Sequence, residues 1–477
     1  MGKQGSGAGS GFETYVDALV EVIGHADRAE PLHDYCRGLM LPVERKSVEP
    51  LAAVTAPARV SAQHQSLLHF VGQAPWSDQA LTGKVRELVL PRMVERGGPI
   101  TAWIVDDTSF PKKGKHSVGV ARQYCGQLGK KENCQVAVSL SIANTAAGLP
   151  IAWRLYLPQA WVDDGERRRK AQIPDAVGFQ TKPQIALDEI REAVAAGVPT
   201  GVILADAGYG VDSTLRAGLT DLGLAYVVGV TSTINVWRPG EGPLPPDCYG
   251  GRGRPPSRLR RDSDHQPLSV KALAEELPAQ ACQKVTWRAG TNGDLTSHFA
   301  AVRVRCAGGD FRLTQPCAEE WLMIEWPEGE DEPTKYWLST LPADTALADL
   351  VAAAKLRWRI ERDYLDLKQE LGLGHYEGRG WRGFHHHASL CIAAYGFLIL
   401  EQETIPPSGA AFAKERPEPP VPRGSRSHSA AAPAGTARAN LDRHDPTSPC
   451  RRPGSAHHAM SMLRPSQLNA SSKFMTQ

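Results

Sequence analysis

The sequence lacks a hydrophobic run long enough to cross a bilayer. Its longest apolar stretch near the end, "SLCIAAYGFLIL" at 389–400, is shorter than the roughly 20 residues that a membrane helix needs. The first residues, "MGKQGSGAGSG", are polar and have no apolar core like that of a signal peptide. We therefore expect a soluble protein with no membrane partner.

Closely spaced cysteines are also missing. The nine cysteines are scattered along the chain, and no two of them stand in a C-x-x-C pair. This spacing excludes a zinc site of that type and a dense disulfide framework, and it favours reduced thiols in a cytoplasm.

The chain has little net charge. Its formal charge is +2 over 477 residues, so any affinity for nucleic acid has to come from local basic patches. This length predicts two to four modules with a sizeable core.

The local composition and apolar spacing of the sequence predict how these modules are arranged. Residues that space apolar side chains three and four apart, as in "FETYVDALVEVIGHA", predict helices, whereas short β-rich runs such as "AWIVD" and "GVILAD" predict strands. The segments are a flexible N-terminus (1–11), a helical module (12–98), the first part of an α/β core (99–234), a β-rich insertion (235–334), the last strand and helices of the core (335–404), and a disordered or degenerate tail (405–477).

The helical module has two readings. Arg45 and Lys46 stand beside Ser47 in the segment between two helices. For any single basic residue there, a solvated loop is the favoured interpretation. The functional interpretation is a small helical module that touches DNA phosphates.

The α/β segment predicts a mixed sheet with helices on its faces. Three strand-like runs, at 102–106, 135–144 and 150–158, come first and can form a meander. Helix and strand then alternate through 182–230, which is typical of parallel pairing. After the insertion, a strand at 335–341 leads into a long helix expected over 346–371 and another near 387–402.

Carboxylates stand at the ends of the predicted strands. In "AWIVDDTSF", a buried strand delivers Asp106 and Asp107 side by side, and in "VILADAGYG" another delivers Asp206. Glu361 lies on the long predicted helix, where Arg357 and Lys368 share its face by spacings of four and seven.

Two strand-end aspartates and a helical glutamate suit a divalent metal. Carboxylate oxygens are the ligands that Mg²⁺ prefers. Two such ions, about 3.5–4 Å apart, activate an attacking hydroxyl and stabilise the leaving oxygen in phosphoryl transfer. Each acid alone is more often a cap, a turn residue or a surface ion pair, but the order Asp, Asp, helical Glu beyond a β-rich insertion is more specific.

The longer motifs resemble a known family. "VDDTSFPKKGKHSVGVARQYCGQLGKKENCQVAVSL", "VILADAGYG" and "RWRIERDYLDLKQELGLGHYEGRGWRGFHHH" are similar to DDE transposases of the IS701 type, within the wider IS4-like group. The resemblance extends over about 15–402. It implies an RNase H-like catalytic core, split before its last catalytic helix by the β-rich insertion, and cut-and-paste transposition with Mg²⁺ or Mn²⁺.

The resemblance also implies site residues and partners. By motif, the catalytic and metal-binding acids are Asp106, Asp206 and Glu361, because Asp106 has Thr108 two places later. Asp107 is expected to point to the opposite face of its strand, in a turn or supporting hydrogen bond. Arg357 and Lys368 are expected to contact DNA, whereas Ala354 stands where the family has a tyrosine. The implied partners are double-stranded DNA at terminal inverted repeats and target, and a second copy of the chain on that DNA, in a bacterial cytoplasm beside the nucleoid.

Three further features each have two interpretations. The arginines of the Pro- and Gly-rich loop, including Arg252, Arg254 and Arg258, form either a solvated loop or a phosphate-contacting arm. Tryptophans in or beside the insertion are core residues or hold a flipped base by stacking. They are Trp287, Trp321, Trp326 and Trp337. The histidines of "FHHH" (384–387) point in different directions on a helix, so packing or DNA contact is favoured over metal binding.

Two other functions use the same residues. A non-transposing nuclease of the RNase H fold would carry the same three acids but would not recognise inverted repeats. A catalytically impaired relic would bind DNA without cutting it, and the unusual tail favours that reading, whereas the presence of all three acids opposes it. A glycosidase built on Asp106 and Asp107 is excluded, because adjacent strand residues diverge and cannot flank one bond.

Overall fold

The computed structural model describes residues 7–290 and 293–401. The described residues all belong to one compact unit. The tail predicted from residue 405, and the end of the last core segment at 402–404, lie outside the described residues.

The N-terminal segment is helical, as predicted, and its helices pack on the last helix of the described chain, α14 (Trp381–Glu401). The Tyr15 hydroxyl donates to the Ala393 carbonyl at 2.8 Å, and apolar side chains from both regions share one core. The first helix begins at Gly7, so part of the N-terminus expected to be flexible is helical. The helices are α1 (Gly7–Val20), α2 (Ala29–Met40), α3 (Val48–Thr55), α4 (Val60–Gly72) and α5 (Asp78–Gly97).

A mixed sheet forms the centre of the fold. The predicted meander is present, because β1 pairs antiparallel with β3 and β3 pairs antiparallel with β4. On the other side, β1 pairs parallel with β5, and β5 pairs parallel with β6. These strands are β1 (Ala102–Pro111), β3 (Lys130–Ala143), β4 (Gly148–Leu155), β5 (Val202–Ala205) and β6 (Tyr226–Val230). A mixed sheet with flanking helices is the arrangement expected of an RNase H-like core.

The insertion strands continue this sheet. Strand β12 (Lys335–Ser339) pairs antiparallel with β6, and β11 (Glu319–Glu325) and β10 (Gly293–Cys306) follow it in order. The edge is completed by β7 (Asn235–Trp237), β8 (Leu268–Ser269) and β9 (Gln283–Gly290). The sequence predicted a β-rich insertion but not that it would extend the core sheet.

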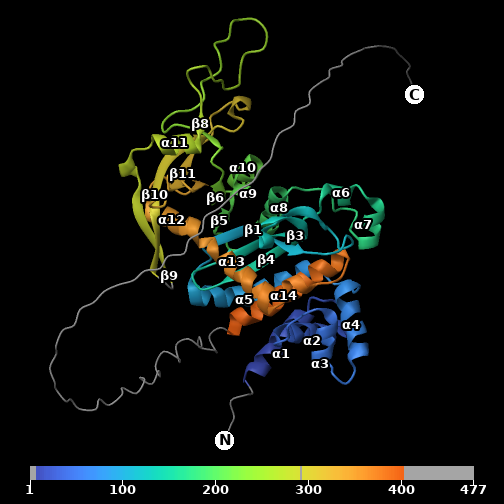
Figure 1. The fold of residues 1–477 in the computed structure, drawn as a ribbon. Helices are drawn as coiled ribbons and strands as arrows, with labels where there is room; N and C mark the ends of the chain where they lie inside the picture. The colour runs from blue at the N-terminus through green and yellow to red at the C-terminus, as the bar shows by residue number, and fades with distance from the viewer. Residues whose placement is uncertain (1–6, 291–292, 402–477) are drawn as a thin grey trace, which may run out of the picture. The chain divides into compact units, whose positions relative to one another are not determined.

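Helices cover both faces of the core strands. Helices α5 and α14 contact β4 from one side, and α8 contacts β3 from the other (Figure 1). Within the described ranges, no helix is long and apolar enough to cross a membrane. The α-helices after the N-terminal segment, apart from α14, are α6 (Gln159–Val162), α7 (Gly165–Ala171), α8 (Lys182–Ala195), α9 (Ala207–Gly210), α10 (Ser213–Asp221), α11 (Val270–Glu276), α12 (Leu347–Leu356) and α13 (Trp358–Leu365). The 3₁₀ turns are Ala26–Arg28, Gly126–Leu128, Ala279–Ala281, Asp310–Arg312 and Leu373–His375.

The long helix expected over 346–371 is divided. Helix α12 ends at Leu356, α13 begins at Trp358, and a π-helical turn, Asp366–Glu370, follows. Arg357 stands at the division, and its side chain is held by carboxylates from two strands. Tertiary contacts of this kind override local helix propensity, and π turns are frequent at functional sites.

One buried ion pair connects α8 to the edge strand β4. Its electrostatics lead to a prediction about how stability depends on pH. The Glu189 carboxylate lies 2.8 Å from Arg154 Nε. Burial raises the pKa of Glu189 to about 7, although Arg154 opposes the rise. Because the folded pKa lies above the ordinary value, the folded state binds the proton more tightly, so this contribution to stability is complete at low pH and is lost as pH rises toward 7.

We expect Glu189→Gln to remove that pH dependence. Between about pH 5 and pH 8 the free energy of unfolding of the wild type should fall by up to roughly 3 kcal/mol more than that of the variant. Urea denaturation at several pH values measures this difference. Parallel profiles for the two proteins would contradict the assignment.

Candidate active site

Asp106 and Asp206 lie side by side on two parallel strands. Asp206 directly follows β5, whereas Asp106 lies within β1, just beyond its paired stretch with β5, and not at the strand end that the sequence predicted. The register of β1 and β5 aligns Ala102 with Val202 and Ile104 with Leu204, and continuing it by two residues aligns the aspartates. The Asp206 carboxylate caps α9 by accepting from the Gly208 amide at 2.9 Å. Helix α9 then turns back against β6, where a Cβ on Gly210 would lie 2.0 Å from the Gly229 carbonyl oxygen.

Arg357 lies between the two carboxylates. Its Nη1 is 3.0 Å from Asp106 Oδ2, and its Nη2 is 3.7 Å from Asp206 Oδ2. Burial raises the pKa of Asp106 to about 7, although the positive charge of Arg357 opposes the rise and Asp206 adds to it. The site therefore holds two adjacent acids whose repulsion is reduced by one guanidinium.

Glu361 belongs to the same cavity but is not gathered with the aspartates. It is exposed on α13, one turn beyond Arg357. A cavity of about 710 Å³ is lined by Asp206, Arg357 and Glu361 together, as well as by Trp358. Asp206 and Glu361 thus line one cavity with Arg357, whose guanidinium also contacts Asp106.

Helix α13 is fastened to the sheet on its buried side. The hydroxyls of Tyr364 and Ser139 lie 2.6 Å apart, and Ser139 is the cross-strand partner of Asp106. The Tyr395 hydroxyl donates to Asp363 at 2.9 Å. These contacts fix the position of α13, and with it that of Glu361, relative to β1, the strand that carries Asp106. Sequence reasoning missed them, although the position of Tyr364, three residues after Glu361, was an available signal.

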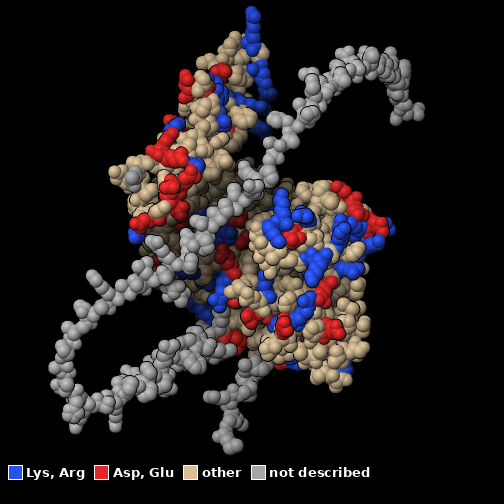
Figure 2. Space-filling model, viewed as in Figure 1, with Lys and Arg blue, Asp and Glu red and all other residues tan. Residues whose placement is uncertain are grey.

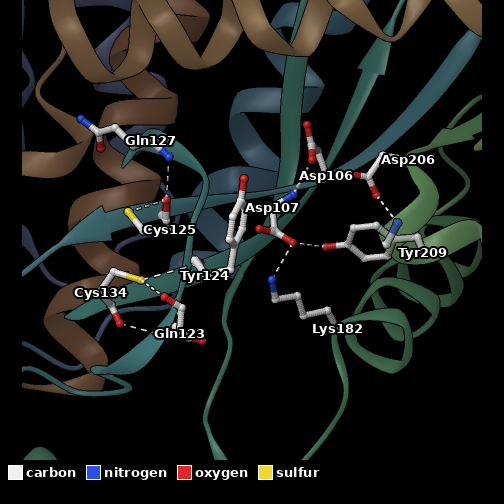
Figure 3. Close-up of polar contacts among 12 residues, drawn as sticks. Asp106, Asp107, Gln123, Tyr124, Cys125, Gln127, Cys134, Lys182, Asp206 and Tyr209 are labelled. Atoms are coloured by element: carbon white, nitrogen blue, oxygen red, sulfur yellow. Dashed lines mark hydrogen bonds and ion pairs between the residues drawn. The ribbon is translucent and has the colours of Figure 1, made fainter. Parts of the chain in front are cut away.

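Asp107 points to the opposite side of β1 from Asp106, as predicted (Figure 3). Its Oδ2 lies 2.8 Å from Lys182 Nζ and accepts from the Tyr209 hydroxyl at 3.3 Å. Lys182 begins α8 and Tyr209 belongs to α9, three residues after Asp206. Asp107 therefore holds together the strand end and the two helices behind the site, a role that the sequence assigned to it without naming the partners.

The predicted DNA-contacting residues lie in two places. Lys368 is beside the site, where its Nζ donates to the Ser109 carbonyl at 3.3 Å and burial lowers its pKa. Arg252, Arg254 and Arg258 are exposed on the long loop between β7 and β8. Figure 2 shows basic side chains at the tip of this loop, which is green in Figure 1. The loop arginines are not brought to the carboxylates, and their contact with DNA stays a prediction.

The insertion places aromatic side chains around a lysine. Lys355 Nζ lies 4.4 Å from the ring centroid of Trp287 and 5.3 Å from that of Trp337, and it pairs with Glu325 at 2.7 Å. Trp321 and Trp326 each donate an indole N–H to a backbone carbonyl at 2.9 Å. In this arrangement all four tryptophans take part in internal contacts.

The three histidines of "FHHH" are buried in α14. His385 accepts from the Leu155 amide at 3.2 Å, His386 stacks on Trp76 with centroids 3.6 Å apart, and His387 lies 2.9 Å from the Tyr35 hydroxyl. Burial lowers the pKa of both His386 and His387 to about 4, so both are neutral. The interpretation that they pack in the core is confirmed.

The donor set of the two aspartates suits a divalent cation. Their facing carboxylate oxygens already receive a positive group, Arg357, and oxygen ligands of this kind are those of Mg²⁺ and Mn²⁺. Among the residues that the structure describes, no three His, Cys, Asp or Glu side chains are gathered as a metal site. Asp106 and Asp206 therefore offer oxygen donors of the type that such an ion takes, and Glu361 is not gathered with them.

Comparisons with known proteins show the family of the chain. A family model described as DDE superfamily endonuclease matches residues 18–294, a range that contains Asp106 and Asp206 and ends before Glu361. The sequence is also similar to the probable transposase for insertion sequence element IS701 of Microchaete diplosiphon. The two are 30% identical over 196 residues, which are 41% of this chain and 47% of the relative. The match thus spans about half the length of that curated relative.

The position of Arg357 leads to a prediction that can be tested without a cleavage assay. We expect Arg357→Gln to lower the melting temperature of the metal-free protein, because two adjacent carboxylates lose their shared cation. Mn²⁺ should then raise the melting temperature of the variant more than that of the wild type, because the ion no longer competes with the guanidinium.

Arg362→Gln is the matched control, because Arg362 lies on α13, which begins directly after Arg357, and pairs with Asp366. Differential scanning fluorimetry with a Mn²⁺ series compares the three proteins. An equal or smaller Mn²⁺ response in Arg357→Gln would show that the guanidinium does not occupy the place of the ion.

Proposed function

Because the chain belongs to the DDE superfamily of endonucleases, we propose that it is the transposase of an insertion sequence, which cuts DNA at terminal inverted repeats and joins the freed ends to a target. The observation that carries the proposal is the alignment of Asp106 with Asp206 on neighbouring parallel strands, beside a cavity that Asp206 and Glu361 line. Two aligned aspartates with a glutamate on a nearby helix supply the kind of oxygen ligands that metal-assisted phosphoryl transfer uses.

The three acids have distinct tasks in this proposal. Asp106 and Asp206 would hold a divalent ion, Mg²⁺ or Mn²⁺, and Glu361 would complete the ligand set, with two ions as the expected number. Such a metal would supply activation of the attacking hydroxyl and stabilisation of the leaving oxygen. Arg357, which contacts both aspartates, would be the residue placed to contact a phosphate of the DNA backbone.

Transposition is favoured over a simple nuclease by the resemblance to IS701-type transposases. That resemblance includes the motif around Glu361, which lies beyond the range matched by the family model. The further expectations are cut-and-paste movement, double-stranded DNA as partner, a dimer of this chain on that DNA, and a place beside the bacterial nucleoid. The nuclease and the inactive relic remain the competing functions.

Inverted repeats on the DNA that flanks the gene separate the first two functions. A transposase is expected to lie between matching terminal repeats, whereas a resident nuclease needs none. Sequencing that DNA tests the proposal without biochemistry, and a gene with no repeats on either side would favour the nuclease.

We expect each of Asp106→Asn, Asp206→Asn and Glu361→Gln to abolish strand cleavage while binding to the inverted repeat is kept. Each change removes a negative ligand and leaves a side chain of nearly the same shape. Cleavage of a labelled repeat duplex in Mg²⁺, and a gel-shift with the same duplex, measure the two properties. Asp107→Asn is the matched control and should keep measurable cleavage, because Asp107 contacts Lys182 and Tyr209 on the other side of the strand.

Full cleavage by any one of the first three variants would remove that residue from the ligand set. Complete loss in Asp107→Asn, with a normal melting temperature, would move the ligand role to Asp107. Loss of binding together with cleavage in all four would point to a folding defect and is detected by the melting temperatures.

Lys368→Ala should weaken binding to cleaved ends and reduce its dependence on salt. One lost phosphate contact lowers the slope of log affinity against log salt by about 0.9. Fluorescence anisotropy over a KCl series measures the slope. An unchanged slope would leave Lys368 as a structural residue that packs over Phe110 and bonds to Ser109.

A further inference from the structure

The segment 112–134 has a charge balance unlike that of the whole chain. It carries six lysines and arginines against one acid, Glu132, whereas the entire chain has a net charge of +2. The segment comprises the loop after β1, strand β2 (Ala121–Cys125), a 3₁₀ turn (Gly126–Leu128) and the first residues of β3. We call it the basic hairpin. Its basic residues are Lys112, Lys113, Lys115, Arg122, Lys130 and Lys131.

The basic hairpin is built rigidly. Strands β2 and β3 pair antiparallel from Ala121 with Cys134 to Cys125 with Lys130. The Asn133 side chain donates to the carbonyls of Lys112 and Gly114, at 2.5 and 2.9 Å, and so holds the loop against the strands. A structured element that gathers cations pays little ordering entropy when an anion binds.

The tip of the hairpin is anchored to the catalytic strand. The Gln127 amide and the Cys125 thiol both donate to the Ser109 hydroxyl, at 3.2 Å in each case (Figure 3). Ser109 lies three residues beyond Asp106 on β1, and its carbonyl accepts from Lys368. The hairpin therefore adjoins the same strand end as the candidate active site.

The outer side of the hairpin exposes an aromatic ring among the cations. Tyr124 is 60% exposed and Leu128 is 44% exposed, which is unusual for large apolar side chains. Tyr124 stands directly opposite Lys131, and Arg122 lies two residues away on the same face of β2. Within the part of the chain that the structure describes, Lys131 and Arg122 have no acid at ion-pair distance, whereas Lys130 has Glu132 at 3.7 Å.

We propose that the basic hairpin is a DNA-contacting element, which holds the duplex next to the scissile phosphate. Cations that lack acidic partners match a row of phosphates, and an exposed tyrosine beside them provides a flat surface for a sugar or base. This inference rests on the proposed function, and it adds a surface that none of the predicted DNA-contacting residues belongs to.

The neighbouring helix α7 offers a control surface. It also carries consecutive basic residues, but Lys170 pairs with Glu166 at 2.5 Å and Asp164 caps the helix. Lys170 is 75% exposed, and Lys130 is 65% exposed, so a Lys→Gln change removes a similar side chain from a similar environment. Both lysines have an acid partner, Glu132 for Lys130 and Glu166 for Lys170, but the hairpin has one acid to six basic residues whereas residues 163–170 have three acids to four.

The test uses the full-length protein and a random-sequence DNA duplex in fluorescence anisotropy over a KCl series. The double variant Lys130→Gln, Lys131→Gln should lower the slope of log affinity against log salt by about 1 to 2, because about 0.9 is lost per phosphate contact. Tyr124→Ala should weaken binding several-fold with the slope unchanged. Lys170→Gln should match the wild type in both quantities.

The outcomes separate this inference from the proposed function. A wild-type protein that cleaves inverted-repeat DNA, with hairpin variants that bind as tightly and with the same salt slope, overturns the hairpin proposal alone. A wild type that neither binds nor cleaves DNA overturns both. Melting temperatures equal to that of the wild type exclude misfolding, and Arg122→Gln, whose side chain is also exposed, gives a second measurement of the slope.

Discussion

Two carboxylates held next to each other on neighbouring buried strands are the constraint on which the rest of the site depends. Because β1 and β5 pair in parallel up to two residues before the aspartates, the backbone holds Asp106 and Asp206 next to each other. Like charges so close are unfavourable unless a cation lies between them or one carboxyl keeps its proton. Arg357 supplies the cation, and the raised pKa of Asp106 shows that burial is only partly offset.

This constraint also explains the shape of the catalytic helix. A regular helix through 346–371 would carry Arg357, Glu361 and Lys368 on one face without regard to the strands. Instead, Arg357 is drawn to the aspartates at the division between α12 and α13, and Tyr364 is held by Ser139 from the strand next to β1. The helix is therefore fixed at both ends of the segment that presents Glu361, and the adjustment falls in the turn at Arg357 and the π turn after Leu365.

The sequence predicted the helices and strands better than it predicted how they pair and pack. Apolar runs located β1, β5 and β6 because such strands are buried on both faces, and the order of the acids identified the site region. Two features were missed for physical reasons. Residues 121–125 alternate polar and apolar side chains too briefly to be recognised as the strand β2, and pairing of β12 with β6 depends on contacts that join residues more than a hundred positions apart. The ion pairs of Arg357 and Asp107 could not be predicted either. Residue spacing indicates which face of an element a side chain lies on, but not which distant group it contacts.

Ser109 links the strand that carries Asp106 to the basic hairpin and to Lys368. Its hydroxyl receives the tip of the basic hairpin, and its carbonyl receives Lys368. Both contacts lie on the strand that carries Asp106, so the cations on either side are positioned by the same backbone as the acid. If the proposed DNA contacts hold, a substrate phosphate bound by those cations would meet the carboxylates in a set geometry, with little reorganisation of the protein. The burial that raises the pKa of Asp106 is thus the same feature that would make its charged form a strong partner for a metal ion.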